Sequence, residues 1–392
     1  MGCNMENFKH YIPTEIKFGK GVISQLPDVL NRFGKNILLT YGGGSIKKSG
    51  LYDEITGLLS SNSFIITECS GVEPNPRIET VERGAALCRE NGIDAVLAVG
   101  GGSVIDCAKA IATGTFCEGD LWNMVLDSRS GRRSLPVIVI LTLSATGSEF
   151  DNKGVISNIS TKEKYSSVFS YPVVSFCDPT YTFSVPKYQT ACGSADILSH
   201  AMEAYFSRTD SSEISDGLAE TIMRTVIHDL PAVLENPDNY DARANLMWAS
   251  SLACSGILDY GKLYPGKTCH AIGHEFSAVY DVTHGEILSI LTPRWMRFIL
   301  RKDPSVAPRF ARFARNVWNL SGENEYQLAE ESINCLEDFL GSIGIATNLT
   351  SLGIGSTDFD DIATHADLRG RCSNSYVPLT HEDVVQILND CL

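Results

Sequence analysis

Asp196 and four histidines, which are side chains of kinds that bind transition metals, occur in two short stretches of this 392-residue chain. Asp196 and His200 are four residues apart in GSADILSHAMEAY, so a helix would place carboxylate and imidazole on one face. His270, His274 and His284 follow in CHAIGHEFSAVYDVTHGE. Carboxylate and imidazole together suit Fe(II), Zn(II) or another divalent first-row ion better than Ca or Mg. The two stretches therefore predict a metal site.

Spacing alone leaves the ligand set open. His270 and His274 are four residues apart and form a second pair at helical spacing. His284 would lie roughly 21 Å beyond His270 on an unbroken helix, so it can join only if the chain turns within residues 280–283. The pattern predicts Asp196 and His200 with two of the three later histidines. An ordinary helix face with one solvated acid is the simpler interpretation of the first pair by itself.

A glycine-rich turn stands out in the first half of the chain. In AVLAVGGGSVIDCAKAIA, a strand over residues 95–99 is followed by Gly100, Gly101, Gly102 and Ser103 and by a helix from about residue 104. Glycines let a diphosphate approach the backbone, and the first turn of a helix offers unpaired N–H groups. We interpret the turn as a phosphate cradle, with a plain tight turn as the alternative. The common GxGxxG fingerprint is absent.

A second glycine cluster bears on the choice of cofactor. Gly43, Gly44 and Ser45 follow the strand predicted over residues 36–40, and no acid directly follows that strand. Glycine N–H groups, Ser45 and Lys47 could bind a 2'-phosphate, whereas an acid would repel it. The sequence therefore favours NADP, with NAD as the alternative. Taken alone, the cluster is equally typical of a flexible surface turn.

A third loop, over residues 142–149, follows a strongly apolar strand. Hydroxyl-bearing loops usually have only turn and capping roles, but this one lies where a parallel strand ends, a placement that strengthens its interpretation as a cofactor-binding loop. The expected contacts are Thr142, Leu143 and Thr146.

The elements that must position these residues change in kind along the chain. Short β-branched runs alternate with helical patterns in the first half, which predicts a parallel sheet flanked by helices. The strands are expected at residues 37–40, 64–67, 95–99 and 137–141, with helices at 51–59 and 78–90. From about residue 186 only helices are expected, at 195–206, 214–230, 241–258, 305–317 and 326–343. We expect an α/β nucleotide-binding domain over residues 1–186 and an all-helical, metal-binding domain over residues 187–392.

Composition excludes several kinds of partner. A net charge of -15, a pI near 5.0 and only 32 lysines and arginines argue against nucleic acid and anionic membranes. No leader-like or membrane-spanning apolar segment is apparent, and the twelve cysteines include no CxxC pair. These features indicate a soluble, cytoplasmic protein with reduced thiols.

At this point the motifs match a known family. The chain closely resembles the iron-containing, or group III, alcohol dehydrogenases, and in particular their butanol dehydrogenase branch. The matching motifs are PTEIKFGKG, GVEPNP, VGGGSVIDCAKAIA, LTLSATGSE, GSADILSHAMEAY and CHAIGHEFSAVYDVTHGE. The resemblance covers nearly the whole chain and implies a dehydroquinate synthase-like architecture.

The resemblance also implies roles for single residues. The metal ligands would be Asp196, His200, His270 and His284, and His274 would be a catalytic non-ligand beside the nicotinamide. Further residues fall where similar proteins contact the dinucleotide: Asn75, Gly101, Gly102, Ser103, Asp106, Thr142, Thr146, Asn152, Lys164 and Tyr181. The usual Thr-Thr-Ala-Gly-Thr-Gly-Ser loop differs here at Leu143, Ser144 and Ala145, which replace Thr, Ala and Gly.

The implied reaction is reversible hydride transfer between NAD(P)H and a short- to medium-chain aldehyde or primary alcohol, with the metal as Lewis acid. A homodimer is expected from the resemblance alone. A polyol dehydrogenase of the glycerol type and a dehydroquinate synthase-like lyase are the alternative activities, and a non-catalytic nucleotide-binding protein is the alternative outside enzymes.

Overall fold

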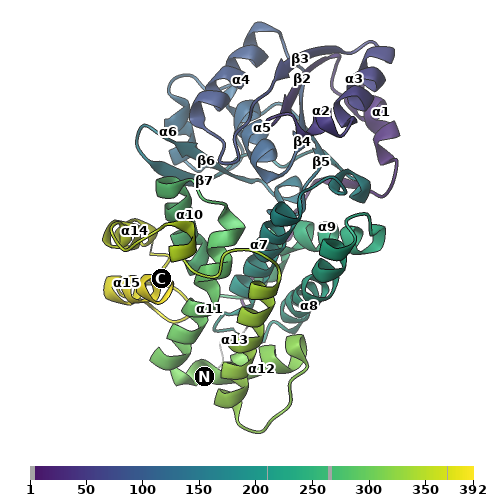
Figure 1. Ribbon diagram of the computed structural model, residues 1–392. Coiled ribbons are helices and arrows are strands. Elements are labelled where there is room, and N and C mark those ends of the chain that lie inside the picture. Colours follow the sequence, from purple (N-terminus) through teal and green to yellow (C-terminus); the bar gives the residue numbers. More distant parts are fainter. Residues whose placement is uncertain (1–4, 210, 264–266, 369) are drawn as a thin grey trace. The chain divides into compact units, whose positions relative to one another are not determined.

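The computed structural model describes residues 5–209, 211–263, 267–368 and 370–392, and they form two compact units (Figure 1). The α/β unit comprises Tyr11–Val185 and Pro237–Ser251. The helical unit comprises residues 5–10 and the segments Pro186–Asn236 and Leu252–Leu392.

Two segments belong to a different unit from the one in which the sequence analysis placed them. Residues 5–10 lie with the helical unit because Phe8 stacks on Tyr260, with ring centroids 4.8 Å apart. Residues 237–251 lie with the α/β unit because Met247 is buried in its core. Neither association leaves a signal in the local sequence pattern.

The α/β unit is built on a six-stranded, fully parallel sheet with strand order β1-β8-β5-β4-β2-β3. The strands are β1 (Glu15–Phe18), β2 (Asn36–Tyr41), β3 (Ile65–Cys69), β4 (Ala95–Gly100), β5 (Val137–Leu141) and β8 (Val174–Cys177). Every residue of β4 and β5 is buried, as expected for a sheet covered on both faces. The predicted parallel α/β fold is confirmed.

Helices cover both faces of this sheet (Figure 1). Helices α4 (Ile78–Glu90), α5 (Gly102–Gly114) and α6 (Leu121–Leu126) share one core, and α1 (Leu26–Leu30), α2 (Ser45–Lys48) and α3 (Leu51–Ser61) share the other. Because successive side chains of a strand point to opposite faces of the sheet, each strand contributes to both cores. In β5, Val139 belongs to the first core, whereas Ile138 and Ile140 belong to the second. Helix α9 (Tyr240–Cys254) adds Met247 to the first.

An antiparallel hairpin interrupts the βα rhythm. Strands β6 (Lys153–Asn158) and β7 (Glu163–Val168) pair outside the main sheet, with Asn158 opposite Glu163. The sequence analysis predicted no strand here, because polar residues interrupt the pattern. The hairpin carries Lys164, one of the residues implied in cofactor binding.

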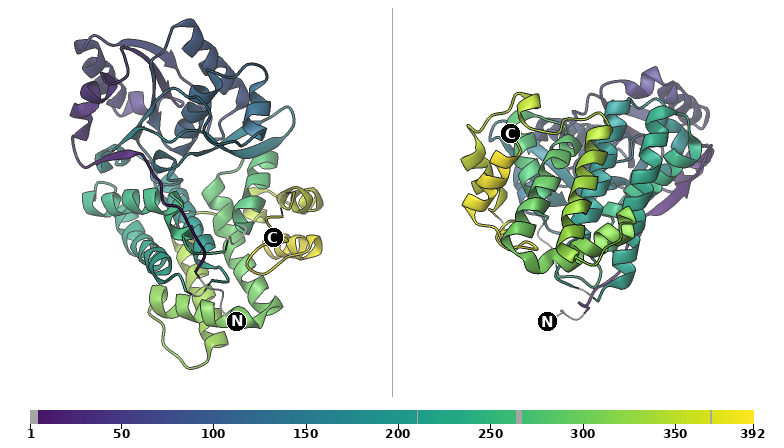
Figure 2. Two further views of the ribbon diagram at one scale, coloured as in Figure 1. Left: turned by 180° about the vertical axis from the view of Figure 1, so that it is seen from behind. Right: turned by 60° about the horizontal axis from the view of Figure 1, so that its bottom comes forward.

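In the helical unit the described residues contain no strand, which agrees with the predicted change of rhythm. Its helices are α7 (Lys187–Tyr205), α8 (Glu213–Glu235), α10 (Thr268–Tyr280), α11 (His284–Lys302), α12 (Ala307–Trp318), α13 (Glu325–Ser342), α14 (Phe359–Ala366) and α15 (His381–Asp390). Helix α7 packs against α8 and α11, and α12 packs against α13 (Figure 1; Figure 2). Within the described ranges no helix has the length and apolarity to cross a bilayer.

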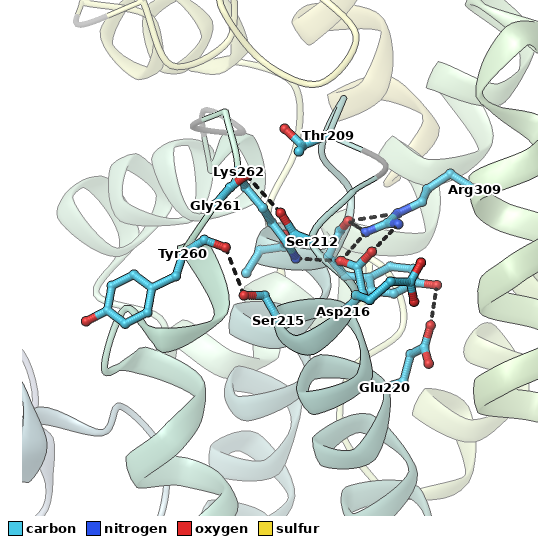
Figure 3. A network of polar contacts seen from close by, with 12 residues as sticks. Thr209, Ser212, Ser215, Asp216, Glu220, Tyr260, Gly261, Lys262 and Arg309 are labelled. Carbon is cyan, nitrogen blue, oxygen red and sulfur yellow. Dashed lines mark hydrogen bonds and ion pairs between the residues drawn. The ribbon is translucent and has the colours of Figure 1, made fainter. Parts of the chain in front are cut away.

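A buried ionic network fixes the C-terminal end of α7 (Figure 3). The Asp216 carboxylate accepts two bonds from Arg309, at 2.5 and 2.6 Å, and lies 2.7 Å from Lys262 Nζ. Arg309 also donates to Tyr205 O, and Lys262 donates to Ala204 O at 2.9 Å. The network thereby joins α7, α8, α12 and the segment that precedes α10.

Candidate metal centre and nucleotide-binding loops

Helix α7 presents three ionisable side chains on one buried stripe. Asp196, His200 and Glu203 occupy positions i, i+4 and i+7, and they are 3, 8 and 2% exposed. The predicted helical placement of Asp196 and His200 is confirmed.

A break between α10 and α11 brings His284 back towards His270. Helix α10 ends at Tyr280, Asp281 adopts a left-handed conformation with φ of 53°, and α11 begins at His284. The ring centroids of His270 and His284 are consequently 5.2 Å apart. The predicted turn within residues 280–283 is confirmed.

Gly285 lets this part of α11 approach α7. A Cβ atom at Gly285 would lie 1.9 Å from the carbonyl oxygen of Cys192, a backbone atom that cannot yield easily. The glycine after His284 is thus required by close packing of the two helices that carry His284 and Asp196.

Four potential ligand atoms converge in this region. Asp196 Oδ1 lies 3.4 Å from His200 Nε2, 3.6 Å from His270 Nε2 and 4.0 Å from His284 Nε2. The Nε2 atoms of His200 and His270 are 3.3 Å apart. Ligands about 2.1 Å from a tetrahedral ion are themselves about 3.4 Å apart. The distances among Asp196 Oδ1, His200 Nε2 and His270 Nε2 are therefore close to those between ligands of a tetrahedral divalent transition metal, and His284 Nε2 lies somewhat farther from Asp196.

His274 lies beside this cluster. Its ring centroid is 4.9 Å from that of His284 and 6.4 Å from that of His270. Among the described residues, the group whose ligand atoms all lie within 4.8 Å of one another consists of Asp196, His270 and His284, and it includes neither His200 nor His274. The geometry thus favours His284 over His274 as the later partner of His270.

Burial and mutual charge set the protonation of the cluster. Burial opposes ionisation of Asp196, but the surrounding imidazoles, His200 foremost, outweigh it and lower the pKa of Asp196. Burial, reinforced by His270, holds the pKa of His200 well below its usual value. An ionised carboxylate and a neutral imidazole are the forms that bind a metal ion.

Glu203 was missed by the sequence analysis. Its carboxylate contacts His270 Nδ1 directly, on the side of the ring opposite to the cluster. Burial opposes a charge on His270, yet the carboxylates of Glu203 and Asp196 together outweigh it and raise the pKa of His270. The sequence feature that could have identified Glu203 is its position three residues after His200, on the same face of the predicted helix.

In the α/β unit, the β4–α5 turn packs tightly against the loop after β5. A Cβ atom on Gly102 would lie 2.2 Å from Thr146 Oγ1, and one on Gly101 would lie 3.0 Å from Leu143 Cβ. Thr142 N–H donates to Gly100 O at 3.0 Å. The structure therefore brings together the two loops from which cofactor contacts were expected, and their packing gives these glycines a structural role as well.

A buried network holds the second of these loops in place. Lys109 Nζ donates to Ser148 Oγ at 2.9 Å and to Asp151 Oδ1 at 2.8 Å. Asp106 accepts from Ser148 Oγ at 2.5 Å and from Val155 N–H at 2.8 Å, and burial raises the pKa of Asp106 to about 6. Both oxygens of Asp106 thus bind protein donors, which gives it an organising role in the loop.

The hairpin and the GVEPNP segment are joined by another contact. Lys164 Nζ donates to Asn75 Oδ1 at 2.8 Å, and Ser103 Oγ donates to Pro74 O. Three expected cofactor residues, far apart in sequence, therefore lie in one region.

The two other expected residues make separate contacts. The backbone oxygen of Asn152 accepts from Phe169 N–H at 2.7 Å at the start of the hairpin. Tyr181 faces Glu54 of α3, with its hydroxyl 3.4 Å from Glu54 Oε2.

The glycine cluster after β2 has an acidic neighbour that the sequence did not reveal. Gly43 has open space where a Cβ would be, and Gly44 has φ of 109° at the start of α2, where Ser45 is the first residue. On the adjacent strand, Glu68 accepts from Tyr41 Oη at 2.5 Å and lies 4.0 Å from Lys47 Nζ. An acid is thus present near this strand end, supplied by β3.

Two family models match this chain, one over residues 13–179, described as iron-containing alcohol dehydrogenase, and one over residues 190–392, described as Fe-containing alcohol dehydrogenase family, C-terminal. The chain belongs to the iron-containing alcohol dehydrogenase family. The predicted family is confirmed, and with it the assignment to the oxidoreductases.

Similar proteins place it within this family. It is 46% identical over 98% of its length to the NADH-dependent butanol dehydrogenase A of Clostridium acetobutylicum, of which the match covers 99%. It is 35% identical to the NADPH-dependent aldehyde reductase YqhD of Escherichia coli, over 89% of this chain and 90% of that one. A crystal structure described as NADH-dependent butanol dehydrogenase A from Thermotoga maritima matches with a TM-score of 0.93 and 38% identity, covering 99% of each chain. These similarities support the butanol dehydrogenase branch and the dehydroquinate synthase-like fold.

Proposed function

We propose that this protein is a metal-dependent alcohol dehydrogenase and aldehyde reductase that interconverts short- to medium-chain aldehydes and primary alcohols with NAD(P)H. The observation that carries the proposal is the convergence of Asp196 with three imidazoles in a chain of this family. Names of similar proteins support the same chemistry, since they are butanol dehydrogenases and an aldehyde reductase.

We assign the metal ligands as Asp196, His200, His270 and His284. The Nε2 atoms of the imidazoles surround one carboxylate oxygen at 3.4 to 4.0 Å, a donor set that fits Fe(II) or Zn(II). When bound, such an ion supplies a Lewis acid that stabilises negative charge on the substrate oxygen.

We propose that His274 transfers the proton of the reaction. Its ring lies 4.9 Å from that of His284, and it is the ring contacts with His284 and His270 that place it beside the proposed ligands, whereas His200 Nε2 lies 3.4 Å from Asp196 Oδ1. An imidazole nitrogen can donate a proton to the product oxygen during aldehyde reduction and accept it during alcohol oxidation.

For the dinucleotide, we propose binding by the two loops packed at the ends of β4 and β5. The turn with Gly101, Gly102 and Ser103 supplies backbone N–H groups at the start of α5 for the diphosphate. Thr142, Leu143 and Thr146 line the neighbouring loop, and the cofactor bound there supplies the hydride.

The preference between NADP and NAD has support on both sides. Gly43, Gly44, Ser45 and Lys47 favour a 2'-phosphate. Against this, Lys47 lies 4.0 Å from Glu68, which offsets its charge, and similar proteins include NADH- and NADPH-dependent enzymes. We retain NADP as the proposal, with NAD as the alternative.

A homodimer and a cytoplasmic location are also proposed. The homodimer rests on family resemblance, and size-exclusion chromatography with light scattering tests it. The cytoplasmic location is supported by the cysteines, none of which forms a disulfide among the residues described.

The activity is tested by following NADPH and NADH absorbance with butanal, glycolaldehyde and dihydroxyacetone. The protein is first stripped of metal and then reloaded with Fe(II) or Zn(II). We expect oxidation of the reduced cofactor with butanal after reloading only. Faster turnover of dihydroxyacetone would favour the polyol alternative, and no aldehyde-dependent oxidation with either metal would overturn the proposal.

The division of roles among the histidines is tested with two variants. His270→Ala should lose both bound metal and turnover, whereas His274→Ala should retain metal and lose turnover. A His270→Ala protein that keeps both, or a His274→Ala protein that loses its metal, contradicts the assignment.

A further inference from the structure

Glu203 makes two kinds of contact with the start of α10. One carboxylate oxygen, Oε2, contacts Nδ1 of His270. The other, Oε1, accepts from Cys269 N–H at 2.6 Å and is 3.4 Å from His270 N. The side chain is 2% exposed, so these contacts are made away from solvent.

The first turn of α10 needs an acceptor from elsewhere. Helix α10 begins at Thr268, and the residue before it, Lys267, makes no capping bond with its side chain. The N–H groups of a first helical turn have no partner within the helix and carry partial positive charge. Glu203, from α7, supplies that acceptor together with a negative charge.

The same carboxylate fixes the ring of His270. A carboxylate at Nδ1 accepts a proton from that nitrogen and leaves Nε2 with its lone pair for a metal ion. Nε2 is the atom that lies 3.6 Å from Asp196 Oδ1 and 3.3 Å from His200 Nε2. The contact with Glu203 therefore sets both the tautomer of His270 and the rotation of its ring.

We propose that Glu203 is a positioning residue for the metal centre, which holds His270 in its metal-binding tautomer and anchors the helix that carries it. The proposal rests on the metal site of the proposed function. It predicts that the affinity for the ion depends on a residue that is not itself a ligand.

The test is Zn(II) affinity of the metal-stripped protein, measured by competition with a chromophoric chelator. Glu203→Gln keeps the shape of the side chain and an oxygen that can accept from Cys269 N–H, but it removes the charge next to His270. We expect a 10- to 100-fold loss of affinity, as is usual for the outer partner of a histidine ligand. Glu203→Asp should restore part of it if the variant reaches Nδ1.

Glu220→Gln is the matched control. Glu220 is also a buried glutamate of the helical unit, 6% exposed, and it accepts from Tyr205 Oη at 2.9 Å. This control should bind Zn(II) as the unmodified protein does. A general loss of stability would weaken both variants, so thermal unfolding of the two metal-free proteins is compared as well.

The outcomes separate the two proposals. If the unmodified protein binds no Zn(II), the proposed metal site fails. If it binds Zn(II) and Glu203→Gln binds within twofold of it, Glu203 is not a positioning residue. Should Glu203→Gln fail to fold, Glu203→Met decides, since it also lacks the carboxylate at Nδ1 of His270, and an unchanged Zn(II) affinity of that variant would reject the role.

Discussion

At the scale of single residues, buried carboxylates distinguish this molecule. Glu149 is 1% exposed, and its Oε1 accepts from Ser251 Oγ at 2.6 Å. Burial raises the pKa of Glu149 to about 7, with Asp151 acting in the same direction and Lys109 opposing it. In the unfolded chain the carboxyl group ionises near 4.5, so the folded state loses stability as pH rises from about 4.5 to about 7.

Glu149→Gln should therefore stabilise the protein at alkaline pH. The amide cannot ionise, and the free energy of unfolding relative to the unmodified protein should rise by roughly 2–3 kcal/mol between pH 5 and pH 8. Urea unfolding at the two pH values measures this change. The exposed Glu330→Gln serves as control, and an equal effect of both variants would contradict the prediction.

A second residue-scale prediction concerns the cofactor. Removing the charge of Glu68 frees Lys47 to interact with a 2'-phosphate, so Glu68→Gln should raise the ratio of kcat/KM with NADPH to that with NADH. An exposed ion pair is worth about 0.5–1 kcal/mol, hence roughly a two- to fivefold change. Asp53→Asn removes a charge from the first turn of α3 and should leave the ratio unchanged. A fall in the ratio for Glu68→Gln would show that the site lies elsewhere.

The candidate ligands could be named from residue type and spacing, whereas their partners could not. Asp196 and His200 are recognisable from their spacing, but Glu68 reaches Lys47 only through the pairing of β3 with β2. Glu203 likewise contacts His270 across 67 residues of sequence. Such contacts follow from tertiary packing, which a pattern within one segment does not contain.

At the scale of elements, the network around Asp216 links four segments through one carboxylate (Figure 3). Asp216→Asn would leave Arg309 and Lys262 buried without their counter-charge. Breaking a buried ionic group in this way typically costs about 3–5 kcal/mol. Urea unfolding should show a loss of that size.

Glu213→Gln is the comparison for this prediction. Glu213 lies at the start of the same helix and pairs with Arg312 at 2.9 Å, but its side chain is 70% exposed. Its loss should cost less than about 1 kcal/mol. Equal losses of unfolding free energy for the two variants would show that burial does not increase the contribution of the Asp216 ion pairs to stability.

Elements with an uninterrupted pattern were predictable within a few residues. The apolar run of β5 and the amphipathic repeat of α4 are examples, since each follows one period over its whole length. The β6–β7 hairpin was not, because polar residues interrupt both of its strands and most of β7 is only half-buried. The break after α10 was predictable only through the requirement that His284 approach His270.

At the scale of the whole molecule, metal and cofactor should stabilise different units. The proposed ligands all lie in the helical unit, and the proposed dinucleotide loops lie in the α/β unit. A ligand at a hundred times its Kd adds about 2.7 kcal/mol of stability to the state that binds it.

Hydrogen exchange should therefore slow in α7, α10 and α11 when Zn(II) is added to the metal-free protein. NADP should instead slow exchange in α5 and in the loop at residues 142–149. Mass spectrometry of the exchanged peptides measures both effects. Protection by Zn(II) confined to the α/β unit would contradict the assignment.

Helix α9 has a consequence for building hybrids of related enzymes. Its residues 240–251 belong to the α/β unit, where Met247 is in the core and Ser251 bonds Glu149, whereas the chain on either side of Pro237–Ser251 belongs to the helical unit. A single crossover near residue 186 would therefore pair the sheet of one parent with the α9 of the other. Exchanging the nucleotide-binding unit intact requires a second graft, from 237 to 251, inside the helical half of the gene.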